Sequence, residues 1–465
     1  MIISFAVRTP RYLLALLLAI IILLPLVPMG RSSNTSNLKS CTIFTAVLGE
    51  QVYFCGNEDF HNTDLLVWFV PNTGTEYGSL RLGYREGKGQ QLSVAMNDQG
   101  LAWDANSIPK TSLNPHPEKP YSGWSDFLSY ITRKVRTVEE VIQLAEEYDF
   151  NDTPLEFLQL QVADATGDAV VIGPGEDGEL YFSRKTPGDG YLISTNFNLA
   201  IPDMGNHPET YLRYDNAAAM LKHLGVSEDI SPEYMGSILE SNHFEFISTY
   251  TLFSFVFDTK NRIAYVYYMS DYDEVIELNL TTELAGSDHI VSMSELVSEK
   301  TRNRALTMYR STMARDIVLI TVFILSLIIL VASLTKGIGY YLRLRRNGQA
   351  PGMRLDDPRY VLAFGLAWIC CFWAVLLFAS HIYPPGIIEA IQPTELFVSS
   401  LKLTIAGSPG IIFAVAGIIL IMRERNIAQN GKLWKVGIPA MIVSLIQLGT
   451  SVYLAVGLIK LFMLL

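Results

Sequence analysis

The sequence predicts an α+β layered domain in the middle of the chain, with apolar segments at both ends. Many short β-rich runs follow one another as antiparallel hairpins, and a few runs with helical spacing interrupt them, which favours layers of sheet and helix. The chain has 465 residues and is 49% hydrophobic, with the apolar excess at its ends. The polar middle carries the net charge of −11, which argues against a nucleic-acid partner.

The apolar segments predict an integral, multi-pass membrane protein with membrane lipid as a partner, because each reaches the ~18 residues of a membrane span. They are residues 12–29, 317–334, 360–380, 403–422 and 436–459. The first follows Arg8 and Arg11, and it suits either a cleaved signal peptide or a retained anchor. The other four predict a C-terminal four-helix transmembrane region.

Lysine and arginine in the short loops set the expected orientation. The loops 335–358 and 423–435 are rich in both, whereas 381–397 has neither. The first two loops are therefore expected in the cytoplasm, and the polar domain outside it. The expected division of the chain is a signal or anchor segment with propeptide (1–40), the folded domain (41–284), a polar helical linker (285–315) and the transmembrane domain (316–465).

The polar domain opens with a predicted hairpin, "CTIFTAV" and "QVYFCG", that turns at Leu48-Gly49-Glu50. Four further runs read as strands: "DLLVWFVPN", "SLRLGYR", "QQLSVAMN" and "GLAWDAN". A helix is predicted in "TVEEVIQLAEEY", where Thr137 and Glu140 have the spacing of a capping box.

The second half of the domain continues the pattern. "LEFLQLQVADATGDAVVIGP" is two strands around a turn, and "GYLISTNFN" is a strand ending in polar residues. "ETYLRYDNAAAMLKHLG" predicts a helix closed by Gly225. "TYTLFSFVFDTKNRIAYVYYM" predicts a long hairpin that turns at Lys260-Asn261.

Only two of the four cysteines, Cys41 and Cys55, lie in the polar domain. They could form a disulfide in an oxidising compartment. "LKSC" is also similar to a lipoprotein box, in which Cys41 would be acylated. A third interpretation makes Cys41 a nucleophile at the first residue of the folded domain.

Six segments in order resemble the choloylglycine hydrolase family of linear-amide C–N hydrolases, which includes bile salt hydrolases and penicillin V acylases. They are "CTIFTA…VYFCGNEDF", "AMNDQGLAWDANS", "TVEEVIQLAEE", "LQLQVADATGDAVVI", "LISTNFN" and "TYTLFSFVFDTKNRIAYVYY". The resemblance covers about residues 41–282. It implies a four-layer αββα Ntn-hydrolase sandwich whose mature chain begins with the nucleophilic cysteine.

The implied activity is hydrolysis of the linear amide bond of an N-acylated small molecule through a thioester. The α-amine of Cys41 would accept the thiol proton, which requires removal of residues 1–40. No metal or organic cofactor is expected. By resemblance, Asp59 hydrogen-bonds the nucleophile and its amine, Asn196 is an oxyanion donor, and Arg213 is the candidate for a late family arginine. Further substrate contacts are expected from Asn106, Ser107 and Trp103.

The chain departs from the family at Gly56, where the family has an arginine beside the thiol that helps to keep it as thiolate. Glu58 also replaces a hydrophobic residue, which indicates a different pocket. The second hypothesis is therefore a catalytically inactive hydrolase-like domain that binds or senses a ligand and is attached to the membrane region.

Overall fold

The computed structural model describes residues 40–314, with gaps at 88, 187, 203–207, 226–229 and 247–248, and four separate positions at 317, 321, 346 and 347. Internal contacts divide the chain into two units, and the domain described below belongs to the unit that includes Ser36–Ala314. Apart from residues 317 and 321, the five apolar runs lie outside the described residues. No helix within the described part is long and apolar enough to cross a membrane.

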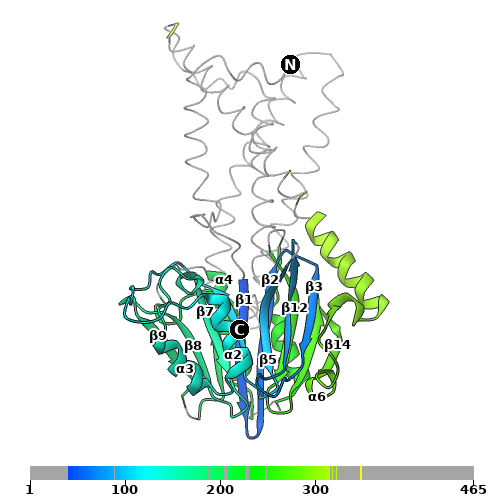
Figure 1. The fold of residues 1–465 in the computed structure, drawn as a ribbon. Coiled ribbons are helices and arrows are strands. Elements are labelled where there is room, and N and C mark those ends of the chain that lie inside the picture. The colour runs from blue at the N-terminus through cyan, green and yellow to red at the C-terminus, as the bar shows by residue number, and fades with distance from the viewer. Residues whose placement is uncertain are drawn as a thin grey trace, which may run out of the picture. The chain divides into compact units, whose positions relative to one another are not determined.

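The first of two antiparallel sheets contains the N-terminal hairpin at its centre (Figure 1). Its strand order is β10-β1-β2-β12-β13-β14, with β11 paired to β12. The bounds are β1 (Ser40–Leu48), β2 (Gln51–Phe60), β10 (Tyr191–Ser194), β11 (Glu245–Phe246), β12 (Thr249–Asp258), β13 (Ile263–Tyr268) and β14 (Asp271–Asn279).

The second sheet has the order β15-β3-β4-β5-β6-β7-β8-β9. Its strands are β3 (Leu65–Val70), β4 (Ser79–Glu86), β5 (Gly89–Asn97), β6 (Ala102–Ser107), β7 (Leu158–Ala163), β8 (Ala169–Pro174), β9 (Leu180–Arg184) and β15 (His289–Ser292). The helices are α2 (Trp124–Lys134), α3 (Val138–Glu147), α4 (Pro208–Leu221), α5 (Pro232–Ser241) and α6 (Leu280–Glu283), with 3₁₀ turns η3 (Pro154–Phe157) and η4 (Met293–Glu295).

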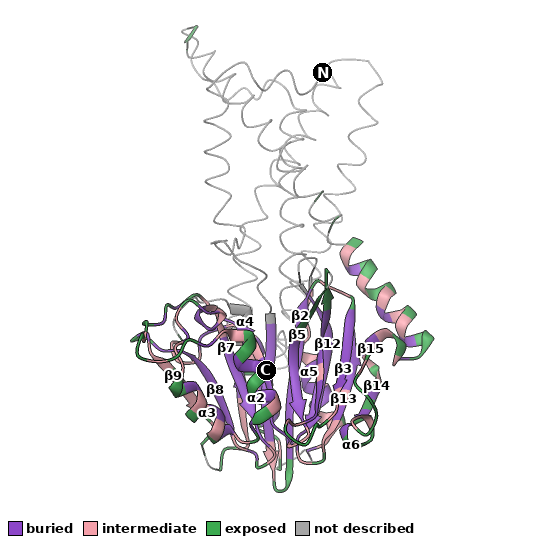
Figure 2. Ribbon diagram, in the orientation of Figure 1, coloured by how far each residue is buried: buried purple, intermediate pink, exposed green. Residues whose placement is uncertain are grey.

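Three apolar cores place these elements in four layers. The central core lies between the two sheets and contains residues such as Ile43, Phe54, Val67 and Leu82. A second core joins α2 and α3 to the outer face of the second sheet, and a third joins α4 and α5 to the outer face of the first. The strands are accordingly buried along most of their length (Figure 2). The expected α+β arrangement with two antiparallel sheets is therefore confirmed for the described residues.

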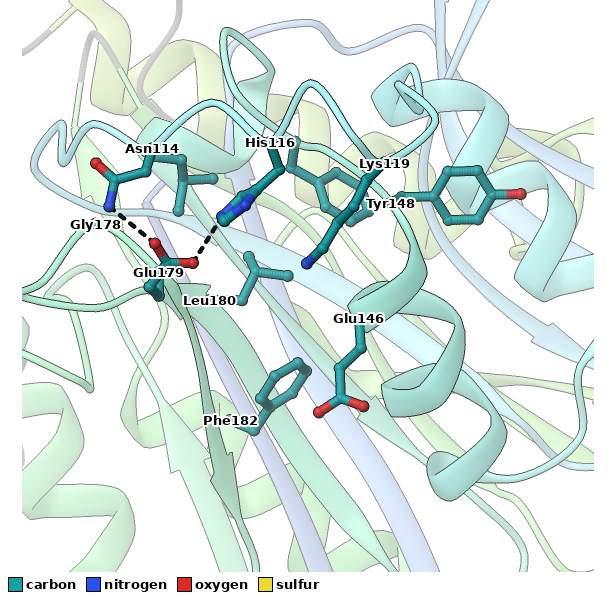
Figure 3. A pocket seen from close by; sticks show the side chains of 11 residues that line it. Asn114, His116, Lys119, Glu146, Tyr148, Gly178, Glu179, Leu180 and Phe182 are labelled. Carbon is teal, nitrogen blue, oxygen red and sulfur yellow. Dashed lines mark hydrogen bonds and ion pairs between the residues drawn. The ribbon is translucent and has the colours of Figure 1, made fainter.

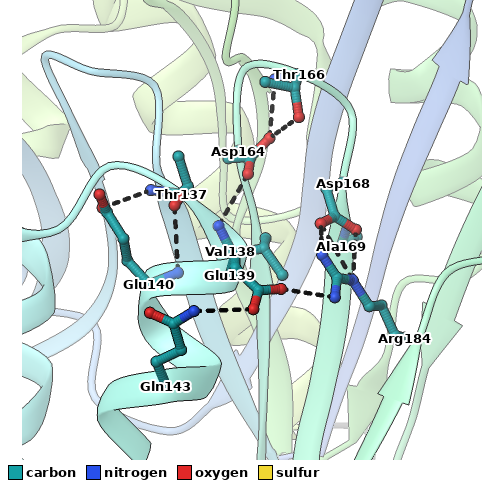
Figure 4. A network of polar contacts seen from close by, with 10 residues as sticks. All are labelled: Thr137, Val138, Glu139, Glu140, Gln143, Asp164, Thr166, Asp168, Ala169 and Arg184. Atoms are coloured by element: carbon teal, nitrogen blue, oxygen red, sulfur yellow. Dashed lines mark hydrogen bonds and ion pairs between the residues drawn. The ribbon is translucent and has the colours of Figure 1, made fainter.

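Local sequence signals account for several boundaries. Thr137 and Glu140 form the expected capping box at the start of α3, and the Asp164 carboxylate accepts a further bond from the Val138 N–H at 2.8 Å (Figure 4). Both groups satisfy N–H groups that a helix leaves unpaired at its first turn. Gly49, in the β1–β2 turn, has φ +59°, a conformation that glycine adopts without steric cost.

The segment expected as a linker, 285–315, contributes to the domain. β15 pairs with β3 at the edge of the second sheet. Residues 299–314 are helical, and Ala305 of this helix is fully buried in the central core. Tyr309 packs edge-on against Tyr250, with ring centroids 5.1 Å apart. The compact unit thus extends beyond the expected boundary at residue 284. The reason is an apolar stripe on this helix, formed by Ala305, Leu306, Tyr309 and Met313, which packs on the central core.

Candidate active site

Cys41 lies at the start of β1 and is fully buried, with its side chain in the core between the two sheets. Its backbone N–H donates to Asn196 Oδ1 at 3.1 Å. This contact follows from strand pairing, since Ile43 is opposite Ser194 and Asn196 comes two residues after it. Two residues that the sequence predicted to act together are therefore neighbours.

Arg213 of α4 joins the same group. Its Nη2 donates to Asn196 Oδ1 at 2.7 Å, and its Nη1 donates to Thr42 Oγ1 at 3.2 Å and to Asp59 Oδ2 at 3.3 Å. The Arg213 and Asp59 side chains are 1% and 0% exposed. Because removing charges from water is costly, a buried ion pair of this kind needs several hydrogen bonds to compensate. Arg213, the candidate for the late family arginine, thus binds Asn196, Thr42 and Asp59 at once.

Asp59 is placed differently from its expected role. It is opposite Ser40 in the β1–β2 hairpin, whereas Cys41 is opposite Glu58. Alternate strand residues face opposite sides of a sheet, so the Asp59 carboxylate lies on the side of α4 and away from the Cys41 thiol. It accepts hydrogen bonds from Arg213 and from the Thr251 hydroxyl. Asp59 therefore reaches the Cys41 N–H through Arg213 and Asn196.

Burial raises the pKa of the Asp59 carboxyl to about 7, although the Arg213 guanidinium and the Thr251 hydrogen bond oppose this rise. A carboxyl with a perturbed pKa beside a charge partner is typical of functional sites, although structural ion pairs also produce one.

Asn196 connects the Cys41 N–H to the end of β6. Its Nδ2 donates to the Ser107 carbonyl at 3.1 Å. The neighbouring Asn106 is fully buried, and its Nδ2 donates to Ser194 Oγ at 3.1 Å. The structure thus brings Asn106 and Ser107 to the Asn196 region, and their expected contacts with substrate stay a prediction. In this state the Asn196 amide oxygen, rather than its nitrogen, is directed at Cys41.

Gly56 has no room for a side chain. A Cβ atom there would lie 2.7 Å from Phe255 Cζ and 3.0 Å from Asp104 Oδ2. Phe255 is opposite Gly56 on β12 and is fully buried. The place where the resemblance expects an arginine is therefore filled by an aromatic ring.

Glu58 is the β2 side chain that contacts the thiol. It is 2% exposed, and Cys41 Sγ donates to its Oε1 at 3.5 Å. Sequence comparison with the family marked this position only as a changed pocket residue. The pairing of the predicted hairpin could have identified this contact. It sets Cys41 opposite Glu58, and opposite residues of an antiparallel pair share a face of the sheet.

Trp103 lies on the outer side of the second sheet, where its Nε1 donates to Thr132 Oγ1 of α2 at 2.8 Å. It helps to line a cavity of about 280 Å³. The walls are mostly apolar, and Ser107 also belongs to them. The other lining residues are Phe60, Tyr84, Glu86, Gln91, Leu92, Ser93, Ala105, Trp124, Leu128, Phe157 and Leu158. Ser107 thus connects this cavity to Asn196.

A second cavity, of about 160 Å³, lies between the loop before α2, the end of α3 and the start of β9 (Figure 3). His116 at its edge contacts Glu179 at 2.7 Å and Glu118 at 3.1 Å. Hydrogen bonds to both carboxylates raise the pKa of His116. None of the site residues expected from the sequence lines this cavity.

The two cysteines are free thiols, and the alternative disulfide is not formed. Cys41 faces the core between the sheets, whereas Cys55 faces the core under α4 and α5. Cysteines whose Cβ vectors point to opposite faces of a sheet cannot be bridged without moving the backbone.

Thr251 is a site residue that sequence reasoning missed. It follows Asp59 by 192 positions, and only the β2–β12 pairing brings it close. Within the described residues, no three or more His, Cys, Asp or Glu side chains are placed to bind one metal ion.

No protein-family model matches the chain, and no curated protein matches it. Solved structures do. Penicillin V acylase from Agrobacterium tumefaciens is 16% identical with a TM-score of 0.43, and the match covers 54% of this chain and 90% of that one. Conjugated bile acid hydrolase from Clostridium perfringens, as its R18L variant, is 16% identical with a TM-score of 0.43, covering 54% of this chain and 96% of that one.

A third match is the Caenorhabditis elegans ortholog of N-acylethanolamine-hydrolyzing acid amidase, at 17% identity and a TM-score of 0.33, covering 47% of this chain and 93% of that one. Identities of this size assign no activity and no residue role to this chain. The first two structures are enzymes of the kinds that the sequence segments resemble.

Proposed function

We propose that this protein is a cysteine amidohydrolase that cleaves the linear amide bond of an N-acylated small molecule. The observation that carries the proposal is the contact of the Cys41 N–H with Asn196 Oδ1, which Arg213 also binds. A nitrogen held in this way is suited to become an oriented α-amine beside its own thiol. The reaction would pass through a thioester on Cys41, which divides amide hydrolysis into two easier steps.

Processing is the first requirement of this proposal. Cys41 is fully buried while residue 40 continues β1 on its N-terminal side. Removal of residues 1–40 would create the α-amine at Cys41. A free amine has a pKa of about 8, so it can accept the proton of a thiol.

Asn196 has two parts to play in this scheme. Its Oδ1 would hold the α-amine, with Arg213 fixing the orientation of the amide. Its Nδ2, now on the Ser107 carbonyl, would donate to the oxyanion of the tetrahedral intermediate. Asp59 would act as a positioning residue, because it binds Arg213 and not the reacting atoms.

The cavity lined by Trp103 and Ser107 is the proposed site for the acyl group. Its aromatic and aliphatic walls favour an apolar acyl chain or ring, as in most small-molecule sites. The anionic Glu86 at the same cavity disfavours a carboxylate on the acyl part.

The location is part of the proposal. The apolar runs and the distribution of lysine and arginine in the loops favour a membrane-anchored protein whose catalytic domain is outside the cytoplasm. A substrate with an apolar acyl group could then partition into the adjacent lipid.

The second candidate function is an inactive domain that binds or senses an N-acylated ligand. The filled position at Gly56 favours it, since no side chain there can stabilise a thiolate. Such a domain would keep the cavity but would not turn the ligand over.

Amine release by the full chain in detergent separates the two candidates. The substrates would be a panel of N-acyl amino acids, acyl-homoserine lactones and fatty-acid amides. An amidohydrolase hydrolyses at least one of them, and Cys41→Ala does not. If the wild type binds members of the panel without hydrolysing any, the binding domain is the better description.

A further inference from the structure

Glu58 is a buried acidic residue among apolar side chains. It belongs to β2, and the neighbours on its face of the strand include Phe54 and Phe60, both in the core between the sheets. Only 2% of the residue is exposed. Burying a carboxylate costs free energy unless a partner compensates, so a glutamate here calls for a specific contact.

The contact is with the proposed nucleophile. Cys41 and Glu58 are opposite each other in the β1–β2 pairing, and Cys41 Sγ donates to Glu58 Oε1 at 3.5 Å. Strand pairing on both sides fixes this geometry, because β2 lies between β1 and β12 in the centre of the sheet. The carboxylate is thus held beside the thiol by the backbone and not by a mobile loop.

The Cys41 thiol has no arginine from β2 beside it, because Gly56 occupies the position where the resemblance expects one. Gly56 is two residues before Glu58, on the same face of β2, and Phe255 and Asp104 occupy the space beside it. The β2 side chain next to the sulfur is therefore an acidic group and not a guanidinium. A carboxylate cannot stabilise a thiolate, but it can accept the thiol proton while the sulfur attacks.

We propose that Glu58 is the general base and acid of the amide hydrolysis. This inference rests on the function proposed above. The Glu58 carboxylate takes the proton from Cys41 Sγ as the C–S bond forms and the carbonyl π electrons move to oxygen. When the intermediate collapses, the C–N bond breaks, and the Glu58 carboxyl gives its proton to the leaving amine nitrogen.

The second half returns the protein to its starting state. Water attacks the thioester carbonyl and loses a proton to Glu58. The C–S bond breaks, the acid leaves, and the Glu58 proton returns to Cys41 Sγ. In this scheme the Glu58 carboxylate, instead of the α-amine of Cys41, carries the proton, and the amine stays on Asn196 Oδ1 and holds the start of β1 in place.

The test compares two substrates that share one acyl group, an amide and its p-nitrophenyl ester. The amine must be protonated to leave, whereas p-nitrophenolate leaves without a proton. Glu58→Gln, which keeps the shape of the side chain, should lower kcat/KM for the amide by about 10²–10⁴-fold, the usual contribution of a general acid–base group. The loss with the ester should be at least about tenfold smaller.

Two further variants complete the experiment. Glu58→Asp keeps a carboxylate and should recover part of the amide activity that Glu58→Gln loses. Glu156→Gln is the matched control: Glu156 is also a buried glutamate, at 4% exposure, but it accepts from the Leu113 N–H and pairs with Lys110 away from the thiol. It should leave the ratio of amide to ester activity unchanged.

The outcomes distinguish this inference from the proposed function. If the wild type is inactive on every amide, or if Cys41→Ala is active, the proposed function fails. If the wild type is active and Cys41→Ala is not, an active Glu58→Gln overturns only the role of Glu58. Equal losses with amide and ester, or a Glu58→Asp variant no better than Glu58→Gln, overturn it as well, because a structural defect affects both substrates alike.

Discussion

Two arginine–aspartate pairs of this domain contrast in their surroundings. Arg184 on β9 bonds Asp168 and Glu139 at the surface, where the Arg184 and Asp168 side chains are 44% and 25% exposed (Figure 4). Arg213 and Asp59 make the same kind of pair with 1% and 0% exposure. The shortest N–O distance of the surface pair is 2.5 Å, against 3.3 Å for the buried pair.

The contrast shows that distance alone does not indicate importance. Water screens the Arg184 pair, and such pairs contribute about 0–1 kcal/mol to stability. The Arg213 pair had to lose its hydration, so it is weak evidence for stability as such. The Arg213 pair matters for the orientation of the site. Arg213 orients the amide of Asn196, and Asn196 accepts from the backbone N–H of Cys41.

The buried pair of Arg213 and Asp59 continues through Asn196 to Cys41, and we call these four residues the buried network. The largest expected effect comes from Cys41. Cys41→Ala should abolish amide hydrolysis, because the atom that forms the thioester is removed. Cys41→Ser should leave at most a trace, since a hydroxyl is far less acidic than a thiol. Cys55→Ser, on the other face of the sheet, is the control and should change kcat little. An equal loss in both serine variants would contradict the assignment of the nucleophile.

Removing the arginine from each ion pair tests whether the buried pair affects the free energy of unfolding more than the exposed pair does. Arg213→Met should lower the free energy of unfolding by about 3–5 kcal/mol, because it leaves the Asp59 carboxyl buried without its cation. Arg184→Met should lower it by less than about 1 kcal/mol. Thermal unfolding of the full chain in detergent, followed by tryptophan fluorescence, gives both changes. Similar shifts in the two variants would mean that burial does not separate the pairs.

The middle of the network should affect catalysis more than stability. Asn196→Ala should lower kcat by about 10²–10³-fold, the usual effect of losing one oxyanion donor. Steady-state amine release on the best substrate measures it, with Asn114→Ala as the control, since Asn114 bonds Glu179 at the surface. A change in KM alone would place Asn196 in substrate binding and not in the transition state.

A smaller effect concerns pH. The folded pKa of Asp59 is about 7, above the reference value of 3.8, so the folded protein keeps a proton that the unfolded chain releases between these values. Stability should therefore fall as pH rises from about 4 to 7. Comparison with Asp59→Asn isolates this contribution, because the variant lacks the titrating group. If the wild type instead gains stability relative to Asp59→Asn as pH rises from about 4 to 7, the pKa of Asp59 is not raised in the folded protein.

Much of the site could be predicted from the sequence. The segments around Cys41 and around Asn196 identified two residues that the fold brings into contact. The resemblance offered Arg213 only as a candidate, and the fold places it against Asn196. The hairpins and the α3 cap follow local rules, so they too could be predicted.

The remaining features depend on register and on distant pairing. Asp59 was expected at the thiol, yet one residue of offset in the β1–β2 hairpin turns it to the other face and brings Glu58 there instead. Phe255 reaches Gly56 only through the pairing of β12 with β2. The Arg184 network joins a strand to a helix 45 residues earlier, and no motif marks it.

The most direct test of the account is the N-terminus of the active protein. Mass spectrometry of the N-terminal peptide, on protein that hydrolyses an amide and whose activity is lost in Cys41→Ala, should find a chain that begins at Cys41 with a free amine. An active protein that keeps Ser40 before Cys41 would contradict the account, because Cys41 would then lack the α-amine that Asn196 and Arg213 are proposed to hold.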